Sequence, residues 1–318
     1  MYVGIGAALL AGAMWGITFV AARLVTPYSA FDLAVARNLV FGLLSLLLMV
    51  RPEFRPTGIS LRDCLMSLLL GFIGYVGIFL SVSFAVVYAG ASLPPLVVGL
   101  MPVILSVVGN VREKTTSWIT LIAPLSLITI GIFFVNLWAV RQVRLGDDPA
   151  DYLLGAAFSV LALLLWILYG VLNAKVMRRP DAPKALPWTS LHGLGALLGS
   201  LPLSVLILQD PAPAISAMTG MDSTASNFLL WAVISGIGGS WIAAWAWSLA
   251  SRHLPLSLSA QLLVSEVCFG LFYGFIYEKR WPSLEETAGA ILMIAGVLIT
   301  IRVFLRAANG DESAVVNV

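Results

Sequence analysis

Charged residues are scarce in this chain. They make up 11% of its 318 residues, whereas hydrophobic residues make up 60% and the mean hydropathy is +0.97. A soluble domain of this length needs about twice that charged fraction to cover its surface. The formal net charge of +2 gives no electrostatic reason to expect nucleic acid binding. The sequence therefore predicts an all-α integral membrane protein.

Cysteine and histidine are also rare, which limits the chemistry that the chain can carry. Cys64 and Cys268 lie far apart, so we expect neither a disulfide nor a metal site. Hydrolysis needs a nucleophile with a base, or metal ligands. His253 lies in a loop, and His192 has no cysteine or paired acid in its segment. We therefore expect no enzyme activity and no cofactor, and we interpret His192 as a hydrogen-bonded helix residue, with a proton relay as the alternative.

Long apolar runs dominate the chain instead. A bilayer core of about 30 Å needs about 20 apolar residues per helix. Ten segments meet this requirement: 3–24, 29–50, 63–87, 92–111, 118–137, 152–176, 187–208, 227–250, 256–276 and 284–304. The first has no basic stretch before it and no small-residue cleavage site after it, so we expect a retained membrane helix. Aromatic residues near segment ends are expected at the membrane interface: Trp118, Trp138, Tyr152, Trp188 and Trp231.

The distribution of lysine and arginine predicts the orientation. With the N-terminus in the cytoplasm, the inner loops hold 12 of these residues and the outer loops hold five. We therefore expect both termini in the cytoplasm, with 307–318 as a cytoplasmic tail. Five helices per half is an odd number, so the second half enters the membrane upside down. The sequence predicts two inverted five-helix repeats, 1–140 and 141–306.

An internal repeat supports this division. Residues 71–131 recur at 236–296 with a shift of 165 positions and no gap. The matches gather on glycines and on one charged turn, which is Glu113-Lys114 in the first copy and Glu278-Lys279 in the second. In a membrane chain, such a repeat indicates a binding site at the interface between the halves.

Aromatic residues away from the segment ends are the first candidates for this site. Trp15 and Thr18 lie near the middle of the first segment, and Trp166, Tyr169 and Asn173 share one face of the sixth. A shift of 151 places Trp15 on Trp166, so each half presents a tryptophan at a similar depth. These residues either line a cavity or fill the core.

Two ionisable residues lie deep in the predicted membrane. Such a residue costs at least ~2.5–3.5 kcal/mol at the bilayer centre and usually marks function. Glu266 is at the centre of the ninth segment, and Gln261 and Ser265 extend its polar face. We expect Glu266 in a cavity; the alternatives are a packed interior or a pair with Arg37. Arg37, in the second segment, binds in the cavity, snorkels, or caps a neighbouring helix.

Several motifs, in this order, resemble the EamA type of the drug/metabolite transporter superfamily: Ala13-Met14-Trp15-Gly16-Ile17-Thr18-Phe19, Arg37, Tyr88-Ala89-Gly90-Ala91-Ser92, Pro102, Glu113-Lys114 and Gly131-Ile132-Phe133. The resemblance implies a ten-helix secondary transporter that works by alternating access. The chain departs from the family at Val267, where a proline often follows the glutamate. Trp15, Tyr75, Trp166 and Trp245 further resemble the aromatic amino acid exporters of this superfamily. That likeness implies a bacterial inner-membrane exporter of amino acids with a central cavity.

The expected cavity residues are Trp15, Thr18, Arg37, Asn38, Tyr75, Met101, Trp166, Tyr169, Trp245, Gln261, Ser265 and Glu266. Met101 stands where those exporters have an aromatic residue, and a methionine makes a softer and less selective wall. We expect a monomer whose partners are the lipid bilayer and a small-molecule substrate. The alternatives are export of other metabolites or drugs, a passive channel, and a membrane scaffold.

Overall fold

The computed structural model describes residues 1–137, 149–209 and 223–308, and this part of the chain is helical without a strand. The elements of the first half are α1 (Tyr2–Leu24), α2 (Ala30–Leu48), η1 (Pro52–Phe54), α3 (Leu61–Phe72), η2 (Ile73–Gly77), α4 (Ile78–Ala89), α5 (Leu93–Val98), α6 (Met101–Glu113) and α7 (Trp118–Val135). Those of the second half are α9 (Pro149–Met177), α10 (Ala185–Gln209), α12 (Ser223–Ile234), η3 (Ser235–Ile242), α13 (Ala243–His253), α14 (Leu256–Leu262), α15 (Val264–Glu278) and α16 (Leu284–Ala308).

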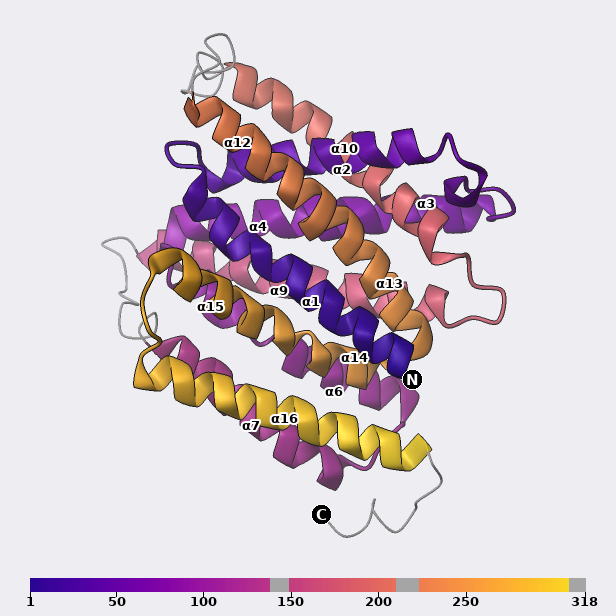
Figure 1. The fold of residues 1–318 in the computed structure, drawn as a ribbon, viewed down its shortest axis with the longest axis vertical. Helices are drawn as coiled ribbons and strands as arrows, with labels where there is room; N and C mark the ends of the chain where they lie inside the picture. Colours follow the sequence, from indigo (N-terminus) through magenta and orange to yellow (C-terminus); the bar gives the residue numbers. More distant parts are fainter. Residues whose placement is uncertain (138–148, 210–222, 309–318) are drawn as a thin grey trace.

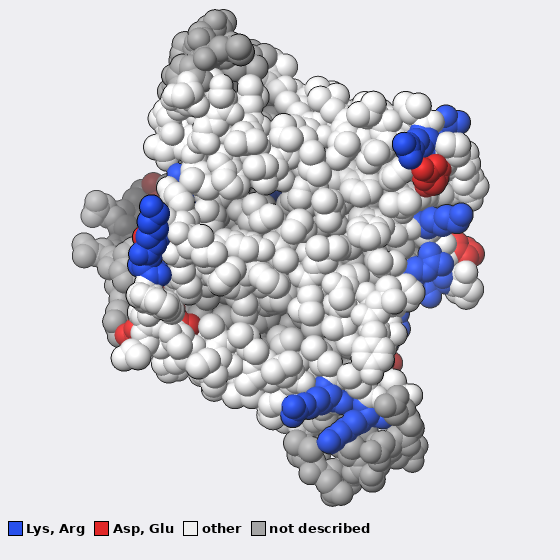
Figure 2. Space-filling view, in the orientation of Figure 1, with Lys and Arg blue, Asp and Glu red and all other residues white. Residues whose placement is uncertain are grey.

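The expected membrane segments correspond to these helices one by one. Within the described residues, nine helical stretches are long and apolar enough to cross a membrane, and α10, 25 residues long, lies where the seventh segment was expected. The helices run side by side (Figure 1). Charged side chains gather at the two ends of the bundle, and the surface between them is almost entirely uncharged on the face shown (Figure 2). Helix α16 continues two residues into the predicted tail, and residues 309–318 lie outside the described part.

Two membrane spans contain a π-helical segment that the sequence did not predict. The first is η2, between α3 and α4, and the second is η3, between α12 and α13. A shift of 165 places Ile73–Gly77 within Ser235–Ile242, with a common end. Insertions of this kind occur frequently at functional sites.

Other local features recur with the same shift. Lys114 and Lys279 end α6 and α15 in the left-handed conformation, with φ of 47° and 51°. The fourth span breaks after α5 at Val98, and the ninth breaks after α14 at Leu262, one residue before the position that the shift gives. The two copies of the repeat therefore share backbone detail as well as glycines.

The helix pairs also recur. Helices α7 and α16 pack together, as do α2 and α10, and the α4–α9 contact has its counterpart in α13–α1. Helices α7 and α16 are antiparallel, because Gly131 faces Gly289 whereas Gly296 faces Ile128. A Cβ added at Gly131 would lie 2.7 Å from the Gly289 carbonyl oxygen, so this contact requires glycine. The antiparallel packing of equivalent helices favours the expected inverted repeat, whose inversion stays a prediction.

One of the predicted interface aromatics is placed differently. Trp118 is exposed as expected, but Trp188 is completely buried, and its Nε1 donates to Asn173 Oδ1 at 2.9 Å. The interface interpretation of Trp188 was therefore wrong. Its position near a helix end fits both roles, and a buried hydrogen-bond partner on a neighbouring helix decides between them. Trp138 lies outside the described residues.

Candidate functional site

A cavity of about 950 Å³ opens between the two halves of the chain. Its walls come from α1, α4, α5, α6, α7, α9, α15 and the start of α16. It reaches from Trp166 and Glu266 in the interior to Arg23 and Arg280 at the end of the bundle where α15 turns into α16. We call this the Glu278 end, and the opposite end, where α6 turns into α7, the Glu113 end.

The deep part of the cavity is apolar and holds one carboxylate. Met101, Pro102 and Trp166 line it together with Glu266. Glu266 lies in the first turn of α15, directly after the break that separates α14 from α15. A carboxylate in such surroundings favours a cationic partner such as an ammonium group.

The aromatic wall has two layers. Trp166 lines the cavity, and its ring meets Trp15 edge-to-face with the centroids 5.5 Å apart. Trp15 is only 5% exposed and also packs against Trp247, with the ring centroids 6.1 Å apart. Trp15 therefore supports Trp166, and the fully buried Trp247 completes an aromatic cluster that the sequence did not predict.

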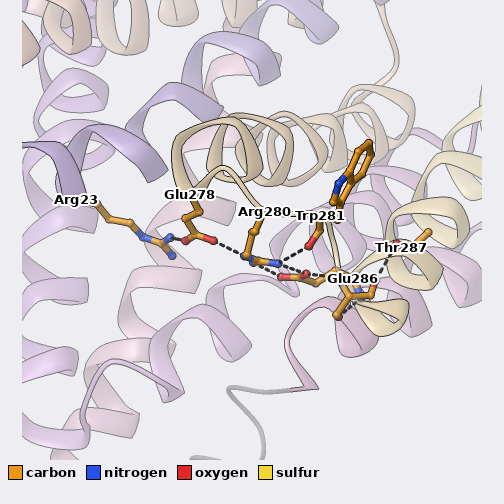
Figure 3. A network of polar contacts seen from close by, with 7 residues as sticks. Arg23, Glu278, Arg280, Trp281, Glu286 and Thr287 are labelled. Atoms are coloured by element: carbon orange, nitrogen blue, oxygen red, sulfur yellow. Dashed lines mark hydrogen bonds and ion pairs between the residues drawn. The ribbon is translucent and has the colours of Figure 1, made fainter.

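A network of charges surrounds the mouth of the cavity at the Glu278 end (Figure 3). Glu278 accepts from Arg23 of α1 and from Arg280. Arg280 also forms a two-point pair with Glu286, at 2.7 Å for each bond. The carboxylates of Glu286 and Glu278 hold the pKa of the Arg280 guanidinium above its usual range. The network therefore links α1, α15 and α16 at the mouth.

The Glu113 end is held by a different set of contacts. Glu113 forms an ion pair with Arg178, just after α9, and accepts the backbone N–H of Leu256 at 3.0 Å. Next to it, Arg179 donates to Asp63 Oδ2 at 2.6 Å, and that carboxylate raises the pKa of Arg179. These bonds join α3, α6, α9 and α14 at the Glu113 end. Among the described residues, none that lines the cavity lies at this end.

Residues 2–137 match the EamA-like transporter family. Over 310 residues the chain is 28% identical to the inner membrane protein YtfF of Escherichia coli (strain K12), covering 95% of this chain and 96% of that protein. A protein solved by crystallography shares the fold with a TM-score of 0.72 at 17% identity, over 94% of this chain and 98% of that one. The first half of the chain therefore matches the EamA-like transporter family that the sequence motifs resemble, and the whole chain is similar to an inner membrane protein. The closer likeness to aromatic amino acid exporters stays a prediction.

Three of the predicted cavity residues line the cavity: Met101, Trp166 and Glu266. Arg37 is not among the lining residues, although it lies within electrostatic range of Tyr75 and Glu266. The described residues contain no ion pair between Arg37 and Glu266, and Arg37 Nε has no hydrogen-bond partner. Arg37 is therefore a buried cation near Glu266, with a guanidinium nitrogen that makes no hydrogen bond.

Asn38 and Tyr75 belong to the packing around the first π segment. Asn38 Nδ2 donates to the Tyr75 carbonyl oxygen at 2.9 Å, so the side chain satisfies a backbone acceptor inside η2. The Tyr75 ring packs on Phe41 with centroids 4.9 Å apart and is 3% exposed. Both residues support the site from outside the cavity.

The remaining predicted residues are buried or half-buried in contacts within and between helices. Gln261 Nε2 donates to Ser106 Oγ at 2.9 Å, and Gln261 Oε1 accepts from Thr300 at 2.5 Å. Thr18 donates to the Trp15 carbonyl oxygen at 2.7 Å, and Ser265 packs against Gly12. Two aromatics also belong to the core and do not line the cavity: Tyr169 and Trp245.

His192 is a hydrogen-bonded helix residue, as predicted. Its Nδ1 lies 2.9 Å from both Ser67 Oγ and the Trp188 carbonyl oxygen. Within the described ranges no group of three His, Cys, Asp or Glu residues could hold a metal ion.

Sequence reasoning missed the mouth residues Arg23 and Arg280, which it counted only as loop charges, and Glu286, which lies inside the tenth predicted segment. The signal that could have found them is the repeated Glu-Lys turn, because each copy places one glutamate where its end of the bundle meets water.

Proposed function

We propose that this protein is a monomeric secondary transporter that exports amino acids, or related small metabolites, across the bacterial inner membrane by alternating access. The observation that carries the proposal is the cavity between the halves, which extends from Glu266 to the charged mouth at the Glu278 end. The Glu113 end is tied together by the Glu113–Arg178 pair. A chamber that is open on one side and closed on the other is the arrangement that alternating access requires.

The lining supports an amino acid as the substrate class. Trp166 and Met101 offer apolar and polarisable surface to a side chain, and Glu266 offers a carboxylate to an ammonium group. Arg37 is the proposed partner of the substrate carboxylate, since it lies within electrostatic range of Glu266. The flexible Met101 beside a rigid tryptophan favours several neutral side chains over a single one.

The proposed motion rests on two inverted repeats, 1–140 and 141–306, with both termini in the cytoplasm. The twin π segments, the twin breaks in the fourth and ninth spans and the antiparallel α7–α16 pair support this arrangement. Inverted repeats allow one half to adopt the conformation of the other, which exchanges the open and closed ends.

The test is uptake of a panel of labelled amino acids into proteoliposomes, by the unaltered protein and by Trp166→Ala. We expect saturable flux that a counter-substrate stimulates, and a loss of about 2- to 13-fold in the variant, because an aromatic contact contributes ~0.5–1.5 kcal/mol beyond its buried area. Trp118→Ala is the matched control, since Trp118 is an exposed tryptophan far from the cavity lining. Linear, unsaturable flux would indicate a channel, and unaltered transport by Trp166→Ala would refute the assigned role.

A further inference from the structure

The two repeated glutamates occupy equivalent positions at opposite ends of the bundle. Glu113 ends α6 and Glu278 ends α15, and each is followed by a lysine whose backbone adopts the left-handed conformation. Each also forms an ion pair with an arginine at the end of the first helix of one half: Arg178 follows α9, and Arg23 lies in the last turn of α1. The chain therefore builds the same glutamate–arginine pair twice, once at each end.

The two pairs differ in what else the glutamate binds. At the closed end, Glu113 also accepts the N–H of Leu256, in the turn that begins the ninth span, and so ties α6 to α14. At the open end, Glu278 accepts from Arg280 instead. The pair at the closed end is also the less exposed one: the side chains of Arg178 and Glu113 are 34% and 18% exposed, against 60% and 29% for Arg23 and Glu278.

The repeat predicts which backbone N–H would be the partner of Glu278, as Leu256 is the partner of Glu113. A shift of 165 places Leu256 on Ala91, in the turn that begins the fourth span. Ala91 lines the cavity mouth together with Glu278 and Arg23. The counterpart of the Glu113–Leu256 bond is therefore a bond from the Ala91 N–H to Glu278, across the opening of the cavity.

We propose that Glu113 and Glu278 alternately hold the two ends of the bundle closed, and we call the hydrogen bond from a backbone N–H to each glutamate a latch. The mouth closes when Glu278 exchanges Arg280 for the Ala91 N–H while Glu113 releases the Leu256 N–H. The inference rests on the proposed alternating access, and it assigns the residues that hold each end. Glu278 is free to make this exchange at low cost, because ion pairs in contact with water contribute little to stability. Arg23 stays with Glu278 throughout, as Arg178 stays with Glu113.

The experiment labels a single cysteine in the cavity with a membrane-impermeant maleimide. Val98→Cys, a lining position on α5, serves as the reporter in a background that carries Cys64→Ala and Cys268→Ala. Glu113→Gln removes the latch of the closed end and shifts the equilibrium toward closure of the mouth. We expect the labelling rate from the Glu278 side to fall at least about twofold, since loss of a hydrogen bond to a charged group shifts an equilibrium by roughly tenfold or more.

The deciding variant is the double substitution Glu113→Gln with Glu278→Gln. It weakens both latches, so the labelling rate should return toward that of the background. The matched control is Glu53→Gln, an exposed carboxylate whose pair with Arg51 is 3.8 Å long. All variants are purified by gel filtration before labelling, so that only folded protein is compared. An unchanged rate in Glu113→Gln, or a double variant that labels as slowly as Glu113→Gln, overturns the proposal.

The labelling assay needs no substrate, so the two proposals fail separately. If amino acid flux is absent while the labelling pattern appears, the substrate class is wrong and the latches stand. If saturable flux is present while Glu113→Gln labels like the background, the latches are wrong and the transporter stands.

Discussion

Replacing the deep carboxylate tests the substrate assignment most directly. Glu266→Gln keeps the size of the side chain and removes its charge in the apolar part of the cavity. A hydrogen bond to a charged group contributes about 1.5–3 kcal/mol, so its loss should raise the half-saturating concentration of an amino acid by roughly 10- to 150-fold. The described residues hold no ion pair to Glu266 that would make the substitution disrupt the fold.

The assay is competition in proteoliposomes between phenylalanine and 3-phenylpropionate, which differ only by the amino group. Unaltered protein should prefer the amino acid, and Glu266→Gln should lose this preference without losing affinity for the deaminated compound. Glu53→Gln provides the control for removing a carboxylate elsewhere. An equal loss of both ligands would mean that Glu266 supports the structure, and unchanged discrimination would refute the assigned contact with the amino group. Repeating the flux with a pH gradient tests whether the same residue couples transport to protons.

Two further predictions concern the scaffold. Gly131→Ala places a Cβ 2.7 Å from the Gly289 carbonyl oxygen and should lower the free energy of unfolding by about 1–3 kcal/mol. The control is Gly6→Ala, which has open space around the new Cβ and should leave the melting temperature unchanged. Equal melting temperatures for the two variants would contradict this prediction. Gln261→Ala leaves Ser106 without its donor from Gln261 and should cost about 1–3 kcal/mol in thermal unfolding without changing substrate preference. A changed preference would return Gln261 to the binding site.

The spans could be predicted because the bilayer sets a length that hydropathy alone reveals. The π segments could not, because hydropathy does not reveal which hydrogen-bond spacing a helix adopts, and neither could the close contacts of the glycines near them. A Cβ at Gly71 would lie 2.0 Å from the His192 carbonyl oxygen, and one at Gly236 would lie 2.6 Å from Val40 Cβ. The sequence shows the glycines, but the partner helices that crowd them come from distant parts of the chain.

The site could be predicted only in part, because one signal has two causes. A polar residue in the middle of a membrane helix either faces a cavity or bonds to another helix. Glu266 lines the cavity, whereas Gln261, little more than one turn earlier, joins Ser106 to Thr300. Five residues along a helix point about 140° apart, and the break between α14 and α15 adds to this difference. The sequence places both residues inside the same predicted segment, about 7.5 Å apart along its axis, but does not say which way each one faces.

The distribution of polar contacts divides the molecule into fixed and exchangeable parts. Inside the bundle, neutral bonds such as Asn38 to Tyr75 and Trp188 to Asn173 are buried, so breaking one leaves an unsatisfied group at a cost of about 1–3 kcal/mol. At the two ends, the bonds include ion pairs in contact with water, where a charge changes partners at a lower cost than inside the bundle. A carrier needs both kinds: the interior must move as intact bodies, and the ends must open and close within a small free-energy range. The placement of Glu113 and Glu278 at the ends, and of uncharged amides within, is what alternating access requires.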